Sequence, residues 1–231
     1  MHKSKKISRQ RFIGTALALP LAVSTAAGQG KAAEGNVGFR LLDHPRHKRD
    51  FGDRRSRWVV FLAHCLANMN ARMHLCANVF PACVKPVIQL CLEREVGIVQ
   101  MPCPELMVVG LGRDRDEPEV EYLRQALEQP IAVERIRKLA EQVVFQMQEY
   151  RFQGFRMIAV VGSDGSPSCG VDQTAWPDPA RRFAEGQGVF VRELKDLMKQ
   201  AGIDLPFKGL EDDKADATVA WLAEQIGKAP G

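Results

Sequence analysis

Short apolar runs alternate with amphipathic stretches along most of the chain. Four apolar runs predict strands, the first of them buried and the last a weak edge strand: Trp58–Ala63, Gly97–Met101, Arg156–Gly162 and Phe207–Leu210. Between or after them, apolar residues recur at helical spacing in five stretches: Val84–Glu95, Pro118–Glu128, the segment after Pro130, Gly188–Ala201 and Asp213–Ile226. Because parallel strands need crossover connections, this alternation predicts an α/β fold. We expect an open, mostly parallel sheet with helices on both faces, in a Rossmann-like three-layer arrangement.

The first thirty residues have the pattern of an export signal. Met1–Arg11 contains basic residues and no acidic one, and Phe12–Ala27 then runs without a charge to small residues near Ala26. This apolar stretch is shorter than the roughly 20 residues of a membrane-spanning helix. The segment Ser8-Arg9-Gln10-Arg11-Phe12 resembles the twin-arginine export signature, with a Gln between the two arginines. We expect an exported, periplasmic protein whose leader meets the export machinery; the twin-arginine route, the Sec route and an uncleaved tether stay open.

Residues 31–57 are polar and lack an apolar period, so we expect an extended arm that either is solvated or touches an acidic partner. Residues 58–231 then form a single domain. The chain has 32 Lys and Arg against 28 Asp and Glu, a net charge of +4, but five of the basic residues fall within the first eleven positions. The basic excess therefore belongs to the leader. We expect no nucleic-acid partner, and no membrane span once the leader is cleaved.

A cysteine follows each of the first three predicted strands: Cys65, Cys103 and Cys169. Ligands of open α/β sheets bind beyond the carboxyl ends of the strands, so these cysteines are expected to share one pocket. They are too far apart for a local zinc motif, and the chain contains no C-x-x-C. Three converging thiolates suit a soft metal centre, and around a [4Fe–4S] cluster they leave one iron open as a Lewis acid.

Polar side chains accompany the three cysteines. Glu105 lies two residues beyond Cys103, where a carboxylate can take or give a proton. Ser166 and Ser168 offer hydroxyls on the loop of Cys169. Several neighbours carry two interpretations each: Asn68 and Asn70 as substrate-binding or loop residues, His64 as a centre ligand or a structural residue, and Asp164 and Asp172 as site residues or solvated turn carboxylates.

Three motifs around these residues resemble a known family: H-C-L-A-N-M-N from His64, C-P-E from Cys103 and G-S-P-S-C-G from Gly165. Together they are similar to the 2-thiouracil desulfidase (TudS) family and, more closely, to its TudS-related members. The resemblance spans about Trp58 to Asp172. It implies an α/β enzyme in which Cys65, Cys103 and Cys169 hold a [4Fe–4S] cluster, Glu105 is the acid/base residue, and Ser166 or Ser168 assists.

The resemblance implies a non-redox reaction in which water replaces the sulfur of a thio-substituted small molecule and the sulfur leaves as hydrogen sulfide. Two other functions stay open. One is an exported cluster-binding redox or sensor module without desulfidase activity. The other is a secreted domain held by disulfides, because six cysteines in an exported chain also fit a disulfide framework. Cys76, Cys83 and Cys91 are expected to be buried apolar side chains or to contribute one disulfide.

Overall fold

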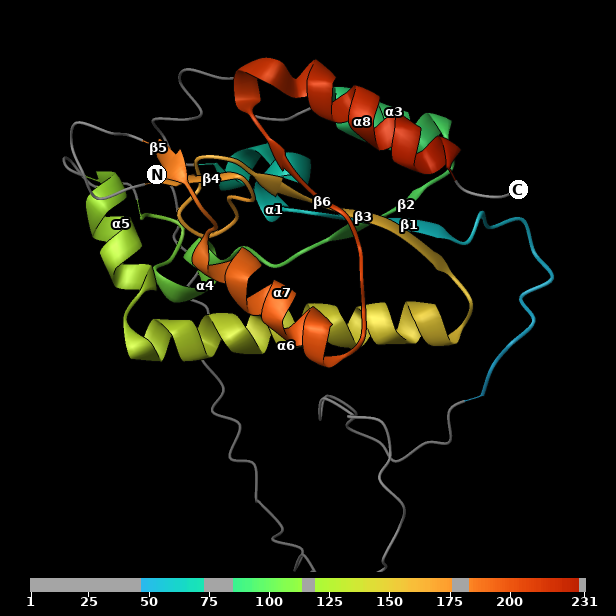
Figure 1. Ribbon diagram of the computed structural model, residues 1–231, viewed down its shortest axis with the longest axis horizontal. Coiled ribbons are helices and arrows are strands. Elements are labelled where there is room, and N and C mark those ends of the chain that lie inside the picture. The colour runs from blue at the N-terminus through green and yellow to red at the C-terminus, as the bar shows by residue number, and fades with distance from the viewer. Residues whose placement is uncertain (1–46, 73–84, 114–118, 176–182, 229–231) are drawn as a thin grey trace, which may run out of the picture. The chain divides into compact units, whose positions relative to one another are not determined.

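The computed structural model describes residues 47–72, 85–113, 119–175 and 183–228 (Figure 1). The helices and strands, in chain order, are β1 (Trp58–Leu62), α1 (His64–Ala67), the 3₁₀ turn η1 (Met69–Ala71), α3 (Lys85–Glu93), β2 (Gly97–Gln100), α4 (Pro104–Val108), α5 (Glu119–Leu127), α6 (Pro130–Phe152), β3 (Arg156–Ser163), β4 (Gln173–Ala175), β5 (Phe183–Glu185), α7 (Val189–Gln200), β6 (Phe207–Leu210), the 3₁₀ turn η2 (Asp212–Lys214) and α8 (Ala215–Gly227). The predicted export signal and residues 31–46 of the predicted arm lie outside the described residues.

Four strands form a parallel sheet in the order β2-β1-β3-β6. The central strand β1 pairs on one side with β2, where Val60 faces Ile98, and on the other with β3, where Leu62 faces Val161. As expected, β6 is an edge strand. Every strand pair is parallel, so the strands of this sheet end at the same edge. The predicted fold class, an open parallel α/β sheet with helices on both faces, is confirmed.

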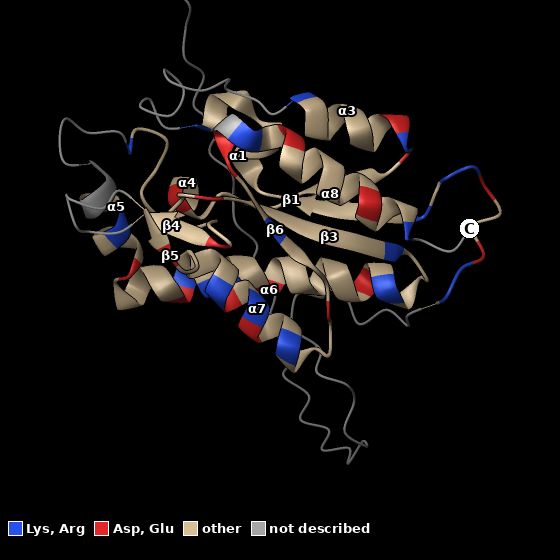
Figure 2. Ribbon diagram, turned by 45° about the horizontal axis from the view of Figure 1, so that its top comes forward, with Lys and Arg blue, Asp and Glu red and all other residues tan. Residues whose placement is uncertain are grey.

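Helices cover both faces of the sheet. On one face α3 packs against α8, and on the other α6 packs against α7 (Figure 1). The side chains of β1 from Val60 to Leu62 are fully buried, because this strand has a helical layer on each side. Figure 2 shows the charged residues mainly on the helices and the connections, while β1 carries none. Among the described residues, no helix has the length and apolar composition needed to cross a membrane.

The structure contains several short elements that the sequence did not predict. These are α1, α4, the two 3₁₀ turns, and the antiparallel pair β4–β5, in which Thr174 faces Ala184. Each is shorter than two helical turns or has only three strand residues, so none repeats a hydrophobic period long enough to recognise. Two of them matter for the site, because α1 contains Cys65 and α4 begins directly after Cys103.

The described part of the arm, residues 47–57, contacts the domain near the start of β3. The Gln153 side chain donates to the carbonyl of His47 at 2.9 Å and accepts from the Arg49 N–H at 3.0 Å. Phe51 packs edge-to-face on Phe155, with ring centroids 5.5 Å apart. These contacts lie at the amino end of β3, and the cysteines follow the carboxyl ends of the strands. The arm therefore joins the domain away from the cysteine edge.

Gly162 fixes how closely the loop of Cys169 approaches β3. A Cβ atom at this position would lie 2.3 Å from the Cys169 carbonyl oxygen and 2.6 Å from Cγ2 of Val171. Contacts this short are not found between real atoms, so a side chain here would displace the loop. Position 162 therefore requires a glycine because the Cys169 loop leaves no room for a side chain, and not because of its backbone conformation.

We predict that Gly162→Ala lowers the free energy of unfolding by about 1–3 kcal/mol, the usual cost of overpacking. The measurement is urea denaturation followed by circular dichroism. Gly227→Ala is the matched control, because a Cβ there meets no atom within 4 Å and alanine favours the last turn of α8. Equal stability of Gly162→Ala and Gly227→Ala would contradict the packing argument.

Candidate functional site

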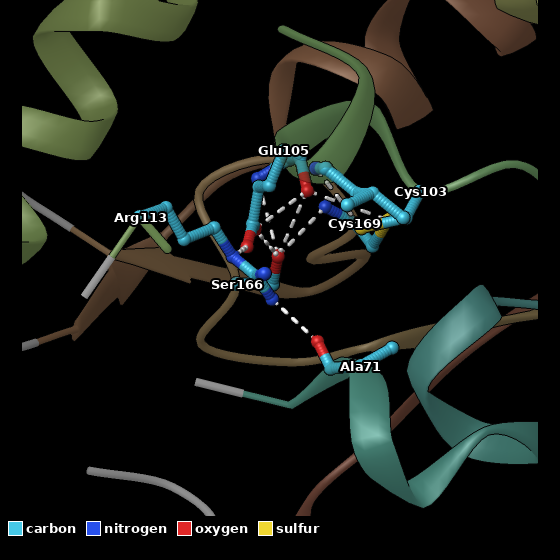
Figure 3. Close-up of polar contacts among 8 residues, drawn as sticks. Ala71, Cys103, Glu105, Arg113, Ser166 and Cys169 are labelled. Atoms are coloured by element: carbon cyan, nitrogen blue, oxygen red, sulfur yellow. Dashed lines mark hydrogen bonds and ion pairs between the residues drawn. The ribbon is translucent and has the colours of Figure 1, made fainter. Parts of the chain in front are cut away.

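The structure places the three strand-following cysteines at one edge of the sheet. Cys65 lies in α1, which follows β1. Cys103 lies between β2 and α4, directly before the helix. Cys169 lies in the loop that follows β3. The three thiols are close enough that ionisation of one disfavours ionisation of the others. Cys103 and Cys169 are buried and Cys65 is half-buried. Figure 3 shows the side chains of Cys103 and Cys169 converging.

Local backbone structure orients the Cys103 thiol. Cys103 is the N-cap of α4 and Pro104 takes the first helical position, where proline's missing N–H has no cost. The sulfur of Cys103 accepts the free N–H of Leu106 at 3.4 Å. The short helix thus presents a backbone donor to the thiol. Burial is the largest cause that raises the pKa of Cys103, and the Glu105 charge adds to it, while the Leu106 N–H opposes the rise.

The loop of Cys169 is held by Asp164 and Ser166. The carboxylate of Asp164 accepts the N–H groups of Val171 at 2.8 Å and Asp172 at 3.0 Å. The hydroxyl of Ser166 accepts the N–H groups of Ser168 at 3.2 Å and Cys169 at 3.0 Å. Asp164 is therefore a half-buried loop-organising residue, while Asp172 is exposed.

Glu105 connects the loops of all three cysteines. It is 6% exposed and lies in the first turn of α4, two residues after Cys103. Its Oε1 accepts the hydroxyls of Ser168 at 2.8 Å and Ser166 at 3.0 Å, both on the Cys169 loop. Its Oε2 accepts Nε of Arg113 at 2.9 Å, and Nη2 of Arg113 donates to the carbonyl of Ala71, six residues after Cys65 (Figure 3). One carboxylate therefore ties together segments that are distant in the sequence.

A second buried ion pair lies beside Cys65. Arg72 and Asp212 contact each other through two N–O pairs, each at 2.6 Å, and their side chains are 3% and 15% exposed. Burial raises the pKa of Cys65, and the positive charge of Arg72 partly offsets this increase. Asp212 follows β6, so the fourth strand of the sheet also contributes to this edge.

Sequence reasoning missed Arg72, Arg113 and Asp212. The rule that placed the cysteines, a functional residue after each strand, would have found Asp212 if it had been applied to the edge strand. Arg113 stands at the start of the polar run R-D-R-D-E, which is indistinguishable from a solvated turn. No periodicity or spacing marks Arg72.

The asparagines and His64 contact mainly their own loop. The Asn68 side chain accepts the N–H of Asn70 at 3.1 Å and lies 3.3 Å from Nε2 of His64. Asn70 is exposed. Burial is the largest cause that lowers the pKa of His64, and a backbone contact with Met101 opposes it. Asn68 thus shapes the turn after Cys65, while Asn70 is the more accessible of the two asparagines.

The four described cysteines are free thiols. Cys91 is buried in the hydrophobic core, as expected for a small apolar side chain, and burial raises its pKa to about 11. Cys76 and Cys83 lie outside the described residues. No disulfide joins any of Cys65, Cys91, Cys103 and Cys169.

The three thiols are soft ligands of the type that bind iron–sulfur clusters. Burial raises the pKa of Cys65 to about 12 and that of Cys169 well above 9.0, so these thiols need a nearby positive centre to ionise. Among the described residues, no three His, Cys, Asp or Glu side chains are close enough to hold one metal ion.

Hydrogen-bond donors also reach two of the sulfurs. Besides the Leu106 N–H at Cys103, the Ser168 hydroxyl lies 3.5 Å from the Cys169 sulfur. Such donors tune thiolate-bound clusters in known proteins. The residues present therefore fit a group bound through Cys65, Cys103 and Cys169.

Comparison with known proteins gives one relative. The uncharacterized protein MJ0003 of Methanocaldococcus jannaschii is 26% identical over 116 residues, which are 49% of this chain and 67% of that protein. No family model matches the chain, and no solved structure does. Since that relative is itself uncharacterized, the similarity assigns neither a family nor an activity.

The two serines are predicted to differ in their contribution to stability. Ser166→Ala removes a hydroxyl that accepts two backbone N–H groups, and these donors are then left without a partner. Ser168→Ala removes a hydroxyl that donates to Glu105. We expect Ser166→Ala to cost about 2 kcal/mol or more of unfolding free energy and Ser168→Ala about 1 kcal/mol, measured by urea denaturation. A larger loss for Ser168→Ala would contradict this assignment.

Proposed function

We propose that this protein is an iron–sulfur-dependent desulfidase. It would remove sulfur as hydrogen sulfide from a thio-substituted small molecule by hydrolytic, non-redox cleavage of the C–S bond. The observation that carries the proposal is the grouping of three thiols from three strand ends around one buried carboxylate. A disulfide scaffold has no need of that arrangement. The resemblance of the three motifs to the 2-thiouracil desulfidase family points to the same chemistry.

In this proposal Cys65, Cys103 and Cys169 hold a [4Fe–4S] cluster. When bound, the cluster supplies an open iron that acts as a Lewis acid toward the sulfur of the substrate. The chain holds the ligand loops in place through Glu105 and Arg113. It also excludes water around Cys103 and Cys169, both of which are buried. Asn68 and Asn70 are proposed to contact the substrate from the turn after Cys65.

Glu105 is proposed to take the proton of the attacking water. A carboxylate has about four acceptor positions, and Ser166, Ser168 and Arg113 fill three of them. One position is left for a water hydrogen. The Ser168 hydroxyl can also turn from Glu105 toward the Cys169 sulfur, 3.5 Å away, which would free a second position on Oε1. Proton transfer by a side chain placed in this way contributes about 10²–10⁴-fold to a rate.

The proposed reaction balances without an electron donor. Water adds to the carbon of the C=S group, one of its protons passes to Glu105, and a C–O bond forms. The C–S bond then breaks, and the sulfur leaves with two protons as hydrogen sulfide. The products are the oxo compound and one sulfide per molecule of substrate.

A cluster-binding redox or sensor module is the second candidate. The observation in its favour is the ion pair between Glu105 and Arg113, because a carboxylate neutralised by an arginine also serves as a purely structural contact. Sulfide release decides between the two functions.

We also propose that the protein is exported to the periplasm. The basic, then apolar, then small-residue pattern of residues 1–30 supports this. The twin-arginine route carries folded proteins, so it would allow the cluster to be inserted before export.

Metal analysis tests the proposed centre. We expect anaerobically purified protein to be brown and to contain about four irons and four acid-labile sulfides per chain. Cys65→Ala, Cys103→Ala and Cys169→Ala should each lose most of the iron. Cys91→Ala is the control, because Cys91 is equally a free buried thiol but lies in α3, which precedes β2, and not at the carboxyl end of a strand. Iron-free wild-type protein, or equal iron loss in Cys91→Ala, would overturn the assignment.

Sulfide release tests the reaction. We expect loaded protein to release sulfide from at least one member of a panel of thiolated nucleobases that includes 2-thiouracil. Glu105→Gln should lower the rate about 10²–10⁴-fold, because the amide is isosteric but cannot take the proton. The amide oxygen can still accept from Arg113, and the serine hydroxyls can rotate to accept from the amide N–H groups, so the variant is expected to fold, with a lower free energy of unfolding because the Arg113 charge loses its partner. Glu128→Gln is the charge-matched control, because Glu128 is exposed and lies directly after α5. Full cluster content with no release from any compound would favour the redox or sensor module.

A further inference from the structure

One buried nitrogen of Arg113 has no hydrogen-bond partner among the described residues. Arg113 is 3% exposed. Its Nε donates to Glu105 and its Nη2 to the carbonyl of Ala71, but its Nη1 donates to nothing. A guanidinium does not lose its protons in proteins, so this donor stays charged. Burying a charged donor without an acceptor is more costly than burying a neutral one, which points to an acceptor that a ligand supplies.

The surroundings of Arg113 indicate what kind of ligand this is. Figure 3 shows its guanidinium pointing toward Glu105 and Ser166, in the network that reaches Cys103 and Cys169. The other buried arginine of the site, Arg72, is engaged by both oxygens of Asp212. Three thiolates would bring more negative charge to this edge than the described arginines offset, since each arginine is already matched by one carboxylate. An anionic acceptor therefore fits beside Nη1.

We propose that Arg113 donates through Nη1 to the anionic centre held by Cys65, Cys103 and Cys169, in addition to its ion pair with Glu105. This inference rests on the proposed function, because it requires a cluster at the three cysteines. Arg113 is then a positioning residue that also sets the electrostatic potential of the centre. A positive charge and an N–H donor near a cluster raise its reduction potential, because they stabilise the more negative, reduced form.

The test is an anaerobic redox titration of the cluster, followed by electron paramagnetic resonance, in Arg113→Gln and Arg113→Lys. We expect the midpoint potential of Arg113→Gln to shift to more negative values. Arg113→Lys keeps the charge and should shift less. Arg137→Gln is the control, because Arg137 pairs with Glu193 and Asp196 between α6 and α7, and its loss should leave the potential unchanged.

The Glu105→Gln background separates the two contacts of Arg113. If Arg113 acted only through the Glu105 carboxylate, removing that carboxylate would abolish the effect of Arg113→Gln on the potential. A direct contact predicts that the negative shift persists in the double variant Glu105→Gln/Arg113→Gln relative to Glu105→Gln alone. Loss of the shift in this background, or no shift in either background, overturns the proposal.

If Arg113→Gln does not bind the cluster, the iron content of the variants is measured instead of the midpoint potential. Iron loss from Arg113→Gln with retention in Arg113→Lys supports the proposal, because the charge is then what holds the centre. Iron loss from both variants with unaltered urea denaturation of the iron-free proteins also supports it. Iron loss from both together with unfolding of the iron-free proteins overturns it in favour of a purely structural role. Absence of iron from the wild-type protein is a separate result that rejects the proposed function itself.

Discussion

The arrangement of the site depends on one buried carboxylate. Glu105 accepts two serine hydroxyls from the Cys169 loop and one guanidinium N–H from Arg113, which in turn holds the loop of Cys65. A carboxylate with so little exposure is stable only if its charge is paired and its oxygens are hydrogen-bonded. Breaking a buried pair of this kind costs about 3–5 kcal/mol, because the remaining charge is left uncompensated. Loop positions and carboxylate charge are therefore coupled, and neither changes alone.

The parallel sheet explains why these loops meet at all. Strands β2, β1 and β3 are neighbours and run in one direction, so Cys103, Cys65 and Cys169 follow adjacent strand ends. The sheet brings the segments to one edge, but it does not set their side chains in contact. The side chains are set by local devices: the N-cap at Cys103, the carboxylate of Asp164, and the space left by Gly162. The sheet topology thus sets which loops are neighbours, and local hydrogen bonds set the positions of the side chains within them.

Much of this architecture could be predicted from the sequence. The apolar runs predicted the four strands and the longer helices, because residues that pack between two layers must be apolar at regular positions in the sequence. The hydrogen bonds around Glu105 have no comparable sequence pattern. Arg113 and Asp164 look like solvated turn residues, and only the folded chain shows that Arg113 is buried and that Asp164 accepts backbone N–H groups. Pairing between Arg72 and Asp212, 140 residues apart, depends on the complete fold and has no local pattern.

The segments that carry the site also carry exposed apolar side chains. Met69 follows Cys65, Met107 lies in α4 with Glu105, and Phe183 covers Gly165 on the Cys169 loop, each about half exposed or more. None of the three takes part in the hydrogen bonds around Glu105. Substitutions of these three side chains would therefore change the outer surface beside the cysteine edge and leave the hydrogen bonds around Glu105 in place.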